Sequence, residues 1–150
     1  MQRISRFAPW INRWALSAST LVFTMIALRY IVDPVRASAA TGVTLAPGLA
    51  TTVTRIGFGA FPLAVAIFTF SCLFSKRRQA AGVELVAIVM FTAIVVRLIS
   101  VAMDGATLQS TRLFIPETAI LLLSLTGMVL ERSRRKLEVP REQRSLKEAA

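Results

Sequence analysis

The sequence predicts an all-α protein: a bundle of four transmembrane helices with a short surface helix in the first outer loop. Hydrophobic residues make up 55% of the 150 residues. They are gathered into long apolar blocks instead of amphipathic stripes, a pattern typical of helices that face lipid. Basic residues are concentrated in alternate connections between these blocks, as expected for a chain that crosses a membrane several times.

The first predicted element is a basic lead, residues 1–13, followed by a span over residues 14–32. Arg29 lies near the far end of this span, where its long side chain can reach the membrane surface. It is four residues from Asp33, a spacing that lets the two pair on one helix face. A signal peptide is the competing interpretation, because residues 37–39 (Ala-Ser-Ala) resemble a cleavage site. The length of the apolar stretch favours a retained span.

Residues 33–54 form the longest connection between spans. Asp33 followed by Pro34 is typical of a helix N-cap and a first-turn proline. This pair predicts a short helix through about Ala40, and its small residues place it near the membrane surface. Gly42 is the expected stop of this helix.

The second predicted span covers residues 53–74. Small residues recur along it and allow a neighbouring helix to approach closely. Pro62 is expected to kink the span, because proline cannot donate the hydrogen bond that a helix interior needs. A ligand groove at the kink is the alternative interpretation. The packing candidates are Gly57, Gly59, Ala60, Pro62 and Ala64.

The third predicted span, residues 83–103, follows a short basic turn at residues 75–82 and has Glu84 in its first turn. The fourth covers residues 113–130, so that the membrane domain extends over residues 14–131. Residues 132–150 form a charged tail.

Thirteen of the 18 basic residues lie in the lead, the turn at residues 76–78 and the tail. The positive-inside rule therefore predicts that both termini are cytoplasmic, in a bacterial inner membrane. Nucleic-acid binding is a poor explanation of this charge, because the clusters lie where membrane exits require them and no base-stacking motif accompanies them. The chain has no histidine and a single cysteine, Cys72. Without a nucleophile–base pair or a metal-ligand cluster, we predict no catalytic residue, metal or cofactor, and an enzyme is the less favoured class.

Charged residues from all four predicted spans fall toward one side of the membrane. Arg97 lies about 14 residues into the third span, roughly 20 Å from its start. An arginine at such depth costs several kcal/mol unless it has a partner or a wet cavity. We expect Arg97 to pair with Glu117, and Arg55 with Asp104 or Asp33. The cluster candidates are Arg29, Asp33, Arg55, Arg97, Ser100, Asp104 and Glu117, with Ser100 linking Arg97 to Asp104 along one helix face.

These motifs resemble a known family. The polar motifs occur in the order Arg55-Ile-Gly-Phe-Gly-Ala-Phe, Arg97-Leu-Ile-Ser100, Asp104-Gly105 and Glu117. This order is similar to the pattern of small bacterial four-helix membrane proteins catalogued as domain of unknown function 4345. The resemblance covers roughly residues 14–135. It implies that Arg55, Arg97, Ser100 and Glu117 are the family's recurring polar positions, and it implies no activity. Ala106 follows Gly105 where the family commonly has a proline, so the loop geometry does not transfer.

Several functional hypotheses fit this pattern. The charged cluster can be a structural lock that fixes helix packing. An excess of arginine over acid on this side also suits a small anionic or lipid-like ligand in the outer leaflet, because Arg112 brings the arginines to four against the three acids Asp33, Asp104 and Glu117. The alternatives are an accessory subunit of a larger membrane complex or a proton-coupled small-molecule transporter that uses Glu117. The expected partners are membrane lipids and either a larger complex or a homo-oligomer, with no nucleic acid.

Overall fold

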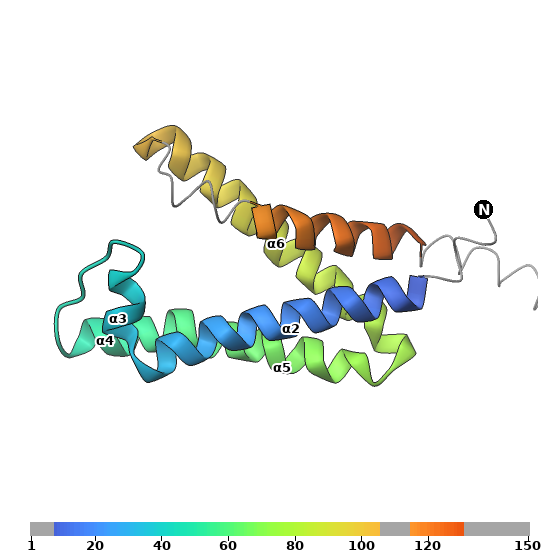
Figure 1. Ribbon diagram of the computed structural model, residues 1–150, viewed down its shortest axis with the longest axis horizontal. Coiled ribbons are helices and arrows are strands. Elements are labelled where there is room, and N and C mark those ends of the chain that lie inside the picture. The colour runs from blue at the N-terminus through green and yellow to red at the C-terminus, as the bar shows by residue number, and fades with distance from the viewer. Residues whose placement is uncertain (1–7, 106–114, 131–150) are drawn as a thin grey trace, which may run out of the picture.

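The computed structural model describes residues 8–105 and 115–130, and every regular element in these ranges is a helix (Figure 1). The predicted all-α fold class is therefore confirmed. Residues 1–7, 106–114 and 131–150 lie outside the described residues. They hold most of the predicted lead, most of the connection expected between the third and fourth spans, and the tail. The described elements are α2 (Ala8–Val32), α3 (Pro34–Ala39), α4 (Leu49–Thr54), the π-helical turn η1 (Arg55–Ala60), α5 (Phe61–Leu73), α6 (Lys76–Asp104) and an unlabelled last helix, Ile115–Leu130.

Three segments have the length and apolar composition of membrane spans. They are Pro9–Val32, Leu49–Leu73 and Arg78–Met103, while Ile115–Leu130 is apolar but shorter. Large apolar side chains such as Leu21 and Phe70 are exposed on the outer faces of these helices. A soluble domain would bury this surface, so its exposure indicates helices that face lipid.

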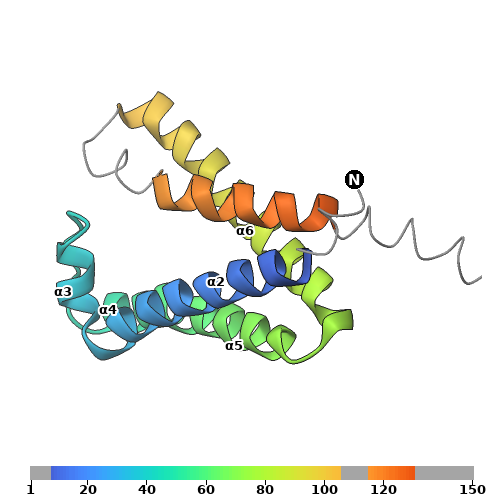
Figure 2. The same ribbon diagram turned by 45° about the vertical axis from the view of Figure 1, so that its right-hand side comes forward.

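Helices α2 and α5 lie side by side along most of their length, as both ribbon views show (Figures 1 and 2). The hydroxyl groups of Thr20 and Thr69 are 2.8 Å apart and join the two helices by a hydrogen bond. Each group is thus satisfied inside an apolar surrounding, where an unpaired hydroxyl would be costly. The buried apolar core lies between α2, α5 and α6 and contains Leu16, Phe23, Ala66, Cys72, Val83, Val86 and Met90.

The expected basic turn at residues 75–82 is wrong, because α6 begins at Lys76 and these residues are helical. Glu84 consequently lies beyond the first turn of α6, which contains no acidic residue. Gln79 is buried and its Nε2 donates to the carbonyl of Leu73 at 3.2 Å. This contact satisfies a carbonyl at the end of α5 that has no partner within the helix, and it holds the tight connection together.

Pro62 is accommodated by the π-helical turn η1 that precedes it. The backbone N–H of Phe61 donates to the carbonyl of Ile56, one residue further back than in an α-helix. Proline removes a donor and crowds the carbonyl four residues before it, and the wider turn relieves both effects. The kink expected at Pro62 is therefore a widened turn within the continuous apolar segment Leu49–Leu73.

Only part of the predicted small-residue stripe packs against another helix within this chain. A side chain at Gly59 would lie 2.7 Å from Ile31 of α2, so glycine permits this close approach. Gly57 has open space around it, and Ala60 and Ala64 are exposed. These three residues lie on faces turned away from α2, because the π-helical turn changes the periodicity on which a single stripe would depend.

Helix α6 crosses α2 and then diverges from the α2–α5 pair, with the last helix, drawn in orange, beside its middle part (Figures 1 and 2). The last helix also packs on α2 near the start of the chain. A Cβ atom at Gly127 would collide with the amide oxygen of Asn12, which is itself buried. Ile120, Leu121 and Met128 complete the contact with the core.

Candidate functional site

The predicted ion pair between Arg97 and Glu117 is present. Arg97 Nε donates to Glu117 Oε2 at 2.9 Å, and Arg97 Nη2 donates to Glu117 Oε1 at 2.5 Å. This two-bond geometry matches the planar guanidinium to the planar carboxylate, the strongest arrangement available to such a pair. Only 22% and 20% of the two side chains are exposed in the isolated chain. The pair thus joins α6 to the last helix in a largely desolvated position.

The sequence places both members of this pair near helix ends. Arg97 lies six residues before Met103, where the apolar segment of α6 ends, which corresponds to about 9 Å along the helix. Glu117 follows Pro116 near the start of Ile115–Leu130. Proline is favoured in a first helical turn, and the positive end of the helix dipole favours an acid there. The guanidinium therefore meets its carboxylate close to one end of both helices.

Ser100 does not extend this pair into a chain of hydrogen bonds. Its hydroxyl donates to the carbonyl of Val96 in the preceding turn of α6, and the residue is exposed. A serine within a helix commonly makes this bond to its own backbone, which removes the need for a side-chain partner. The side chain of Asp104, the predicted end of the chain, lies outside the described part of the structure.

Arg55 has a different partner from the acids expected for it. Its Nε donates to the backbone carbonyl of Ile31 at 3.2 Å, and no ion pair joins it to Asp33, whose side chain is described. Ile31 lies in the last turn of α2, whose carbonyl groups lack helical donors. Arginine is well suited to such a carbonyl, because the negative end of the helix dipole also attracts its charge.

Asp33 acts as the N-cap of α3. Its Oδ1 accepts a hydrogen bond from the backbone N–H of Arg36 at 3.0 Å, and Pro34 occupies the first turn. The short helix predicted from this pair of residues is confirmed. It also explains why Asp33 does not pair with Arg29 four residues earlier, because the turn from α2 into α3 directs the carboxylate toward the new helix.

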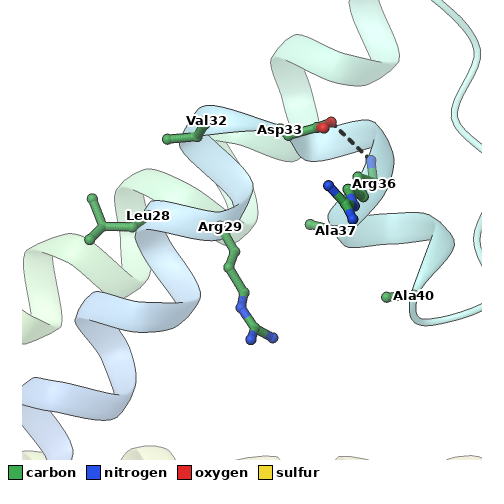
Figure 3. A pocket seen from close by; sticks show the side chains of 7 residues that line it. All are labelled: Leu28, Arg29, Val32, Asp33, Arg36, Ala37 and Ala40. Atoms are coloured by element: carbon green, nitrogen blue, oxygen red, sulfur yellow. Dashed lines mark hydrogen bonds between the residues drawn. The ribbon is translucent and has the colours of Figure 1, made fainter.

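Arg29 and Arg36 lie together at the corner between α2 and α3. A pocket of about 570 Å³ lies at this corner, and both arginines line it together with Asp33 (Figure 3). Arg36 was not among the predicted cluster residues. Arg36 lies three residues after the N-cap aspartate Asp33, so the two residues share the first turn of a helix. This spacing could have indicated that the Arg36 side chain lies near the end of α2.

The charged residues thus form two groups in the described part of the structure, where the sequence predicted one layer. Arg97 and Glu117 join α6 to the last helix, whereas Arg29, Asp33, Arg36 and Arg55 lie around the end of α2. No hydrogen bond or ion pair between described residues connects the two groups. The first group is fully paired, which suits a structural role, and the second leaves two guanidinium groups open to a pocket.

Comparison with known proteins gave a match to one family model. Residues 11–127 match the family described as Domain of unknown function (DUF4345). No curated protein and no solved structure matched the chain. The family match covers both members of the Arg97–Glu117 pair and the whole α2–α3 corner.

Proposed function

The chain belongs to the DUF4345 family by this match, and we propose that it is a non-catalytic membrane protein with four spans. In this proposal the Arg97–Glu117 pair fixes the packing of the last helix, and polar residues at the outer side bind a small anionic or lipid-like ligand. The observation that carries the proposal is the bidentate pair itself. The two hydrogen bonds that Glu117 accepts from Arg97 give its carboxylate a packing role, because an unpaired arginine within an apolar span would be costly.

The contacts of the last helix support a fourth span. Its start is joined to Arg97 near the end of α6, and its residue Gly127 meets Asn12 near the start of α2. The same end of the bundle contains the contact of Gly82 with Leu16 and Cys72. The last helix therefore runs from one end of the bundle to the other. Its 115–130 range corresponds to about 24 Å.

Exposed tryptophans support placing the start of the first span at a membrane surface. Trp10 and Trp14 are 62% and 64% exposed near the start of α2, where they suit the interface between lipid and water. The basic residues that precede and follow the membrane segments favour cytoplasmic termini and an inner membrane.

Single-cysteine labelling tests the number of spans. In a Cys72→Ala background, cysteine is introduced at Thr44 between α3 and α4, at Arg78 in α6, or at Ala150 at the end of the chain. An impermeant maleimide applied from outside to intact cells is expected to label Thr44→Cys alone. Labelling of Ala150→Cys together with Thr44→Cys would show an odd number of spans and contradict the proposal. Labelling of all three after permeabilisation is the control for reactivity.

Native mass spectrometry of the detergent-solubilised protein tests the ligand. We expect a bound species with the mass of an anionic lipid or a small anion, retained when Arg97 and Glu117 are both replaced by leucine. Loss of the species from that variant would place the ligand at the paired residues instead. A protein that carries no such species after gentle extraction, and acquires none when anionic lipid is added, would contradict the ligand part of the proposal.

A further inference from the structure

The pocket at the α2–α3 corner combines positive charge with apolar surface. Its volume of about 570 Å³ lies within the roughly 300–1,000 Å³ typical of small-molecule sites. It is formed where the chain leaves α2 and returns through α3, so residues seven apart in the sequence face one space (Figure 3). The lining residues are Leu28, Arg29, Val32, Asp33, Arg36, Ala37 and Ala40.

Two guanidinium groups line this pocket without a carboxylate partner among the described side chains. Neither Arg29 nor Arg36 forms an ion pair with a described acid, and both are exposed. The one carboxylate nearby, on Asp33, is directed to the backbone N–H of Arg36 (Figure 3). The lining therefore has a net charge of +1, and the donors of both guanidinium groups remain available to a ligand.

Apolar side chains lie beside these charges. Leu28 and Val32, one helical turn apart on α2, are 52% and 75% exposed, and both line the pocket. They belong to the last turns of a segment with the composition of a membrane span. A ligand with an anionic group and an apolar portion would satisfy both parts of this surface at once.

We propose that Arg29 and Arg36 bind a phosphate-bearing anion in this pocket. Each planar guanidinium can donate paired hydrogen bonds to phosphate oxygens, and two such groups on one pocket provide a specific site for that chemistry. The phosphate belongs either to the headgroup of an anionic lipid, which the adjacent Leu28 and Val32 favour, or to free inorganic phosphate. This inference rests on the proposed function and assigns its ligand to a pocket and a chemical class.

Calorimetric titration of the purified full-length chain in lipid-free detergent tests the assignment. The titrants are dihexanoyl phosphatidic acid, dihexanoyl phosphatidylcholine and inorganic phosphate. We expect wild-type protein to bind phosphatidic acid at least about tenfold more tightly than phosphatidylcholine, because its phosphate has one more free oxygen for a charge-assisted hydrogen bond, worth roughly a factor of ten, and no choline cation beside it. The Arg29→Gln and Arg36→Gln variants are each expected to lose about tenfold in affinity, and the double variant about a hundredfold.

Two further variants separate binding from folding. Arg13→Gln removes an exposed arginine near the other end of α2 and is expected to change the affinity less than about twofold. Asp33→Asn keeps a residue that caps a helix well but removes the negative charge from the pocket. We expect it to tighten anion binding severalfold, an effect that damage to the fold would not produce.

The outcomes distinguish a lipid phosphate from free phosphate. They also separate failure of the pocket assignment from failure of the proposed ligand. Binding of phosphatidic acid alone supports a lipid headgroup, and equal binding of inorganic phosphate supports the free anion. If the Arg29→Gln, Arg36→Gln double variant binds phosphatidic acid with wild-type affinity, the ligand does not bind in this pocket. The anionic or lipid-like ligand of the proposed function would then bind elsewhere on the protein. Failure of wild-type protein to bind any phosphate-bearing titrant would overturn this inference and count against the proposed ligand. Neither result bears on the Arg97–Glu117 pair or on the number of spans.

Discussion

Replacing Arg97 by leucine while Glu117 remains is expected to lower the free energy of unfolding by about 3 kcal/mol. The variant leaves a carboxylate that has lost both of its hydrogen bonds in a position where only a fifth of the side chain is exposed. Removing one partner of a buried pair typically costs about 3–5 kcal/mol, and the residual exposure places this pair at the lower end. Denaturant unfolding in mixed micelles, followed by circular dichroism, measures the change.

The double variant with leucine at both positions tests whether the pair is a lock. Replacing both members by apolar residues removes the desolvated charges together, and such replacements are often neutral or stabilising. We therefore expect most of the lost stability to return. Glu84→Gln is the matched control, because Glu84 is an exposed acid on the same helix, and it is expected to change stability by less than about 0.5 kcal/mol. A double variant as unstable as the sum of the two single variants would show that the pair does not act as a unit.

The Arg97–Glu117 pair was predictable because the physical constraint on it is severe. An arginine within an apolar span needs an acid, and Glu117 opens the next apolar helix at a matching depth. The all-α fold followed from equally strong constraints, namely apolar blocks of spanning length and the clustering of basic residues between them. The Asp33–Pro34 cap was predictable from local geometry alone, since both residue types have one preferred position at a helix start.

The partners of Arg55 and Ser100 were not predictable from charge pairing. Each found a backbone carbonyl instead, at Ile31 and Val96 respectively. Backbone acceptors are present at every residue and leave no mark in the sequence, so a search for complementary charges passes over them. The carbonyl of Ile31 was available because α2 ends one residue later, and that position follows from where Pro34 stops the helix.

The start of α6 was not predictable from the distribution of charge. Residues 75–82 contain three consecutive basic residues, which suggested a solvated turn, but lysine, arginine, glutamine and alanine are all good helix formers. Charge bears on the orientation of a chain in a membrane and gives no information on backbone conformation. For the same reason Gly82 was assigned to the turn, whereas it lies within α6 and packs against Cys72 of α5 and Leu16 of α2.

Gly82→Leu is expected to destabilise the protein by about 3 kcal/mol. A Cβ atom at this position would lie 2.8 Å from the Cβ atom of Cys72 and 2.8 Å from Cδ2 of Leu16, so α5 and α6 would have to separate and the side chain of Leu16 on α2 would have to be displaced. Both neighbours are fully buried, and Cβ of Cys72 cannot move without its backbone. Overpacking of this kind typically costs about 1–3 kcal/mol, and the presence of two opposing contacts places this site at the upper end. The same unfolding measurement checks it.

Gly57→Leu is the matched control, because Gly57 is a helical glycine in an apolar segment with no atom near its missing side chain. Helix propensity alone predicts that this change is neutral or stabilising by about 0.5–1 kcal/mol. A second-site test identifies the cause of the Gly82 effect. Gly82→Ala combined with Leu16→Ala removes one of the two clashing atoms, so the double variant should lose less stability than the sum of the single variants. Strict additivity would mean that Leu16 does not limit the approach of α6 to α2, and that the three helices do not meet at Gly82 as described.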